Sequence, residues 1–108
     1  MTPEMIEILI ECRLRMLILE DATDADYRYQ WDRRDWELQV DVGPAYNSRE
    51  WFNVNDDRSR QRYCRAIKRL VNAGLVDAFD LFDDGRTTHI ALTEAGIAAV
   101  ESLGREPG

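Results

Sequence analysis

The stretch RSRQRYCRAIKRLVNAGLV, residues 58–76, has the pattern from which the fold of this chain can be predicted. Projected at 100° per residue, its apolar side chains gather on one side and its cations on the other. Acceptor side chains at residues 55–57 are candidate N-caps, and Gly74 is a helix stop because glycine accepts the left-handed conformation. The pattern predicts a helix over residues 57–73, with one face for a core and the opposite face for a polyanion or for water.

Positive charge is concentrated on this stretch. Residues 58–76 carry +6 without any acid, whereas residues 1–57 carry six basic and fourteen acidic groups, and residues 77–108 carry two and seven. The whole chain has a net charge of −7. Such segregation is typical of an electrostatic binding surface. The alternative is a solvated basic face that acidic neighbours balance.

A β-hairpin is predicted after the basic helix. Residues 76–82 (VDAFDLF) and 87–92 (TTHIAL) have strand character, and the DDGR sequence between them is typical of a tight turn. Thr93 is then expected to cap a short helix over residues 93–103, which Gly104 would end.

The order of these motifs resembles the winged helix-turn-helix core of MarR-like transcriptional regulators. The motifs are RAIKRL from Arg65, GLV from Gly74, DGR from Asp84 and IALTEAG from Ile90, and the resemblance covers roughly residues 48–103. It implies an α+β winged helix-turn-helix domain whose basic helix lies in the DNA major groove. It also implies that the arginine at the wing tip reaches the backbone or the minor groove, and that residues 76–92 form the wing.

The start of the chain predicts a helix with two partners. Threonine, proline and glutamate at residues 2–4 are a helix start, and the helix should run to about Glu20. Its apolar residues cover more than one stripe, which indicates a second packing surface. In a single domain of 108 residues, we expect that surface to belong to another subunit. A homodimer through this helix and the C-terminal helix is therefore predicted.

Residues 21–47 form an insertion relative to the family pattern. Tyrosines and tryptophans alternate with polar residues on both sides of DRRD, which predicts a β-hairpin over residues 27–42. Two alternatives stay open, a helix over residues 24–37 and a strand over 36–42 that pairs with the wing. We interpret the aromatic residues as core, the alternative being a ligand pocket or stacking on single-stranded bases. Residues 48–53 (SREWFN) should form the first helix of the helix-turn-helix, which spans 48–73.

No motif for catalysis or metal binding is found in the sequence. His89 lacks a neighbouring nucleophile or ligand, and Cys12 and Cys64 lack metal-ligand spacing. We expect no enzyme activity, no cofactor and no metal. We expect a cytoplasmic protein, since we find neither a signal peptide nor a membrane span. A small-molecule effector cannot be assigned.

The predicted function is that of a transcriptional regulator that binds double-stranded DNA. Gln61, Arg62 and Arg65 are expected at base edges, and Arg58, Arg69 and Arg86 at phosphates. Arg60 is expected on the buried side of the helix. Two alternatives are a protein-interaction winged helix and an acidic protein of a mobile element that mimics nucleic acid. The predicted DNA-binding residues are Arg49, Arg58, Gln61, Arg62, Arg65, Lys68, Arg69 and Arg86.

Overall fold

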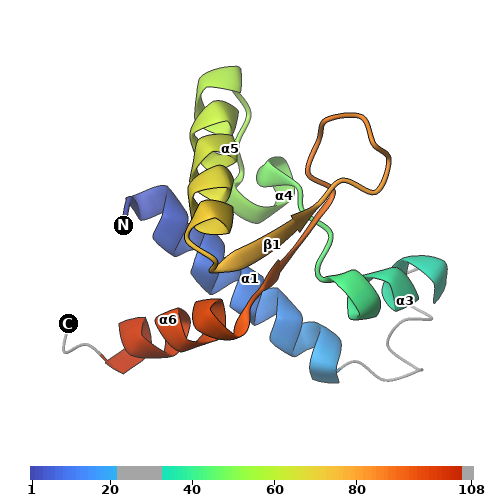
Figure 1. Cartoon of the computed structure of the whole chain (residues 1–108). Helices are drawn as coiled ribbons and strands as arrows, with labels where there is room; N and C mark the ends of the chain where they lie inside the picture. The colour runs from blue at the N-terminus through green and yellow to red at the C-terminus, as the bar shows by residue number, and fades with distance from the viewer. Residues whose placement is uncertain (22–32, 106–108) are drawn as a thin grey trace.

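The computed structural model describes residues 1–21 and 33–105, which form an α+β structure (Figure 1). Its described elements, in chain order, are α1 (Pro3–Asp21), α3 (Arg33–Val42), α4 (Ser48–Phe52), α5 (Asp57–Asn72), β1 (Val76–Phe79), β2 (His89–Leu92) and α6 (Glu94–Arg105). This order is compatible with a winged helix. α1 runs through the middle of the molecule, with α5 above it and α6 below it in Figure 1.

Side-chain caps define where four of these helices begin. Thr2 and Asp56 each accept a hydrogen bond from the backbone N–H three residues later, at 3.3 and 3.0 Å, and Thr93 does the same at 3.1 Å. Asn47 accepts from two successive backbone N–H groups of α4. These contacts satisfy donors that have no partner within the helix. The helices predicted at residues 1–20, 48–53, 57–73 and 93–103 are confirmed, although α6 continues past Gly104 to Arg105.

The strand predicted over residues 36–42 is wrong, because these residues form the helix α3. Gln39 is buried, whereas Leu38 and Val40 are 38% and 52% exposed. The buried positions therefore follow the helical period of 3.6 residues. They do not follow the alternation of apolar and polar residues in the sequence. Residues 27–32 of the predicted hairpin, and most of the alternative helix over 24–37, lie outside the described residues.

The sheet is antiparallel, with Val76 of β1 opposite Leu92 of β2. The other edge of β2 pairs with residues 44–46, through an isolated bridge between Ala45 and His89 and backbone hydrogen bonds of 2.8 and 3.2 Å on either side of it. Residues 44–46, just after α3, thus lie beside the wing strand β2, where one alternative from the sequence placed a strand over residues 36–42. Gly43 is required just before it, because a Cβ there would lie 2.6 Å from the carbonyl oxygen of Ile90.

The connection of the wing is longer than the predicted tight turn. The paired strands end at Phe79 and begin again at His89, so residues 80–88 form a loop. The Asp80 carboxylate accepts hydrogen bonds from the backbone N–H groups of Asp84, at 3.3 Å, and Gly85, at 2.7 Å. The Asp80 side chain thus binds backbone N–H groups of the turn, and the Leu81 N–H donates to the Thr88 hydroxyl at 3.1 Å and not to a strand carbonyl.

The core forms on one face of α1. Ile8, Leu9 and Cys12 are completely buried and belong to one cluster with Leu70 of α5 and Ile90 of β2. The opposite face of α1 is also apolar but exposed, as the sequence predicted. Its exposed residues are Ile10, Leu14, Leu17 and Ile18. No helix among residues 1–21 and 33–105 is long and apolar enough to cross a membrane.

Gly96 fixes the distance between α6 and the segment before β1. A Cβ at this position would lie 2.0 Å from the carbonyl oxygen of Leu75, so Gly96→Ala should destabilise the fold by about 3 kcal/mol. Gly104→Ala in the same helix is the matched control, since nothing lies within 4 Å of its added methyl group. Urea denaturation of both variants measures the difference. Equal stability of the two would contradict the close packing of α6.

Candidate nucleic-acid interface

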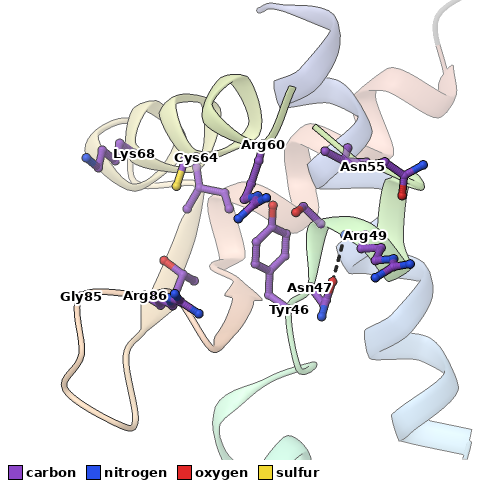
Figure 2. Close-up of a pocket in the computed structure, with 13 residues that line it drawn as sticks. Tyr46, Asn47, Arg49, Asn55, Arg60, Cys64, Lys68, Gly85 and Arg86 are labelled. Atoms are coloured by element: carbon purple, nitrogen blue, oxygen red, sulfur yellow. Dashed lines mark hydrogen bonds between the residues drawn. The ribbon is translucent and has the colours of Figure 1, made fainter. Parts of the chain in front are cut away.

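An open groove of about 790 Å³ lies between α4, α5 and residues 80–88, the wing loop (Figure 2). Among the residues that the structure describes, four cationic side chains line it, and no aspartate or glutamate does. The four are Arg49, Arg60, Lys68 and Arg86. In a chain with a net charge of −7, this groove is a local concentration of positive charge.

Three separate elements position these cations. Arg49 is in the first turn of α4, two residues after the Asn47 cap. Arg60 and Lys68 are eight residues apart on α5, with Cys64 between them, so all three project from the side of α5 that faces the wing. Arg86 follows Gly85 in the wing loop, and its backbone N–H donates to the Asp84 carboxylate at 3.0 Å.

An aromatic pair supports the side of the groove next to α4. The Tyr46 ring packs edge-on against Trp51, with 5.2 Å between ring centroids, and the Trp51 indole N–H donates to the carbonyl of Ala45 at 3.0 Å. Burial raises the pKa of the Tyr46 hydroxyl above its ordinary value, so the group stays protonated and can donate a hydrogen bond. Ile67 and Val54 add apolar surface to the same groove.

Most of the positive charge in the groove has no acidic partner in the part of the chain that the structure describes. Arg60 forms an ion pair with Asp57 at 2.7 Å. Arg49, Lys68 and Arg86 form no ion pair with any residue in the part of the chain that the structure describes. Three cations are therefore available to an external anion.

The predicted DNA-binding residues fall into three groups. Arg49, Lys68 and Arg86 line the groove. Arg62, Arg65 and Arg69 line a second, shallower depression together with Thr2 and Glu4 at the start of α1. Arg58 and Gln61 are exposed on α5 and line neither depression.

Arg60 corrects one expectation and adds a residue to the site. The sequence placed it on the buried side of the helix, yet its side chain is 60% exposed and lines the groove. On the helical projection it lies between Ile67 and Val71, but it belongs to the first turn of α5 and Val71 itself is 40% exposed, so this edge of the apolar face is not covered and a long arginine side chain can turn outward. Its spacing of four and eight residues from Cys64 and Lys68 is the signal that would have identified it.

Outside the groove, a polar contact adds to the core packing between α5 and α1. Tyr63 donates a hydrogen bond to the Glu7 carboxylate and stacks on Phe52 with 4.4 Å between ring centroids. Burial, followed by the interaction with Glu7, raises the pKa of Tyr63 to about 12. The tyrosine is therefore a neutral donor at physiological pH.

The acids of the wing do not enter the groove. Asp77, Asp80, Asp83 and Asp84 are all exposed, and none of them lines it. The described residues also contain no group of three or more histidine, cysteine or acidic side chains that could hold a metal ion. His89 is buried in the sheet, with its Nδ1 2.9 Å from the Thr88 hydroxyl.

Comparison with known proteins gives no relative for this chain: no family model, no curated protein and no solved structure matches it.

The two cysteines should differ sharply in reactivity. Cys64 is exposed on the groove wall, whereas burial raises the pKa of Cys12 from 9.0 to about 12. At pH 8 we expect a thiol reagent to modify one cysteine in the folded protein and both in denaturant, because the reactive thiolate of Cys12 is suppressed by folding. Since folding raises this pKa, the stability that Cys12 contributes is present below pH 9 and is lost as the pH rises toward 12. Rapid modification of both cysteines in the native protein would contradict the burial of Cys12.

Proposed function

We propose that this chain is a DNA-binding transcriptional regulator that contacts duplex DNA with α5 and the wing loop. The observation that carries the proposal is the groove between α4, α5 and the wing, which four cations and no acid line among residues 1–21 and 33–105. The charge pattern of the sequence and the motif order of a winged helix support the same function.

Duplex DNA fits this groove better than a small anion does. The cations come from three elements and lie along an open groove, as suits a line of phosphates. A helix beside the groove also presents polar side chains outward, and an α-helix fits the width of the major groove.

The polar and cationic side chains of the site divide between two roles in this proposal. Gln61 and Arg65 lie near the outward ridge of α5 and read base edges, for which amide and guanidinium groups are suited. Arg49, Lys68 and Arg86 bind phosphates on the wing side. Arg62 and Arg69 bind phosphates on the α1 side, so Arg62 changes from a base contact to a phosphate contact.

Fluorescence anisotropy with mixed-sequence duplex DNA tests the groove directly. Affinity should fall steeply as NaCl rises from about 50 to 200 mM, and Lys68→Ala should reduce the slope of log K against log salt by about 0.9. Arg13→Ala is the matched control, because it removes the same charge from α1, where Arg13 pairs with Glu20. Absence of binding at about 50 mM salt would reject the proposal and favour a winged helix that docks on protein.

Arg65 separates base reading from phosphate binding. Arg65→Ala should cost about 1–3 kcal/mol of binding to the preferred sequence and relax the preference at one base pair. A sequence-selection experiment on randomised duplexes measures both effects. An equal loss across all sequences would instead make Arg65 a phosphate contact.

We further propose that the protein is a homodimer through the exposed apolar face of α1. Leu14 and Ile18 on that face are 52% and 56% exposed, and burying them against a second copy would remove apolar area from water. α6 contacts α1 and can extend the interface.

Leu14→Glu should dissociate this dimer, because it places a charge in an apolar contact. Val40→Glu on α3 is the matched control, since Val40 has the same exposed fraction, 52%. Light scattering coupled to size exclusion, at about 500 mM NaCl to suppress electrostatic association, measures the mass of each variant. A monomeric parent protein, or a Leu14→Glu variant that remains dimeric, would reject the proposed interface.

A further inference from the structure

The wing loop exposes a large apolar side chain among acids. Phe82 is 75% exposed, more than any other large hydrophobic side chain that the structure describes, and the adjacent Leu81 is 39% exposed. Asp80, Asp83 and Asp84 flank this pair in the sequence. A pair of apolar side chains left in water at a loop tip forgoes the stabilisation of burial, which points to a contact with another molecule.

Hydrogen bonds within the loop hold this tip in a defined shape. The Asp80 carboxylate binds two backbone N–H groups, and the Leu81 N–H donates to the Thr88 hydroxyl at 3.1 Å. Asp83 adopts a left-handed conformation with φ of 54°, which aspartate tolerates better than most residues. The tip is thus preorganised for a partner, which lowers the entropy cost of binding.

The acids make DNA a poor partner for this tip, because carboxylates are repelled by phosphates. A surface complementary to this acidic and apolar tip is the cationic groove of the protein itself. The groove has three cations without an ion pair to any described residue, Arg49, Lys68 and Arg86, and apolar surface from Ile67. The tip does not fill the groove of its own copy, since Phe82 remains exposed.

The tip and the groove are close together on the molecule. Gly85 and Arg86 belong to the same loop as Phe82 and form one side of the groove (Figure 2). The tip and the groove thus lie next to each other on one surface. If two copies are related by a two-fold axis, the tip of each can enter the groove of the other, and the pair is closed.

We propose that two copies of this chain pair face to face, each placing residues 81–84 of its wing in the cationic groove of the other. The Phe82 ring packs on the apolar part of the groove, and Asp83 and Asp84 pair with its cations. This pairing covers the groove and thereby prevents the protein from binding DNA. The regulatory effect rests on the proposed function, whereas the pairing itself does not.

Sedimentation velocity of the Leu14→Glu protein, in which the α1 contact is removed, tests the pairing. We expect a dimer at about 50 mM NaCl and a monomer at about 500 mM, because salt screens the charge pairs. Phe82→Ser, and the double change Asp83→Asn with Asp84→Asn, should each weaken this dimer by at least about tenfold. The amide at position 84 keeps the oxygen that accepts from the Arg86 N–H. Asp77→Asn is the matched control, an exposed wing acid on β1, outside the loop.

DNA affinity of the same variants, measured at protein concentrations where the parent is dimeric, gives the second result. Phe82→Ser should bind duplex DNA about threefold tighter or more, since its groove is open. The pairing is overturned if no salt-sensitive dimer forms or if Phe82→Ser dimerises as tightly as its parent. An unchanged or weaker DNA affinity of Phe82→Ser overturns the regulatory role, and a weaker one makes Phe82 a DNA contact. If no variant binds DNA, the proposed function fails, but loss of the low-salt dimer in Phe82→Ser still supports the pairing.

Discussion

The burial of one face of α1 is the constraint on which the rest of the structure depends. Ile8, Leu9 and Cys12 have no exposed surface, and α3, α5, α6 and β2 all contact this helix. Because α5 and β2 pack into the same cluster, the position of the basic helix relative to the wing is set through α1. The groove between them therefore has a shape determined by core packing, which is rigid, and its polar side chains are supported from behind.

The wing shows how an acidic segment can border a cationic groove without cancelling it. The carboxylates of Asp80 and Asp84 accept backbone hydrogen bonds inside the loop, so two of its acids are used to shape it. Arg86, in the same loop, lines the groove instead. At short range the direction of each side chain matters more than the net charge of its segment, because screening in water limits electrostatic effects to about 10 Å.

How much of this structure could be predicted depended on whether the decisive contacts were local. Helices with a cap and a clear stripe, such as α5, followed from their own residues. Residues 36–42 and 80–88 did not. Gln39 turns inward to accept from the N–H of Ala45 at 3.1 Å, and the side chains of Asp80 and Thr88 accept the backbone N–H groups of the loop. The candidate site divides in the same way. Arg49, Lys68 and Arg86 were predicted by charge, and Arg60 could have been identified from its spacing to Lys68, whereas Tyr46 belongs to the groove only because distant elements meet there.

In the proposed function, the two faces of α1 would link assembly to recognition. Its inner face packs against α5 in the core, and Glu7 accepts a hydrogen bond from the hydroxyl of Tyr63 on α5. Its outer face carries exposed apolar side chains such as Leu14 and Ile18. If two copies join through the outer face, the separation and angle of the two α5 helices are fixed by α1 alone, with no flexible connection between them. The spacing of DNA half-sites would then be a property of this one helix, because a rigid dimer accepts only sites that match the distance between its reading helices.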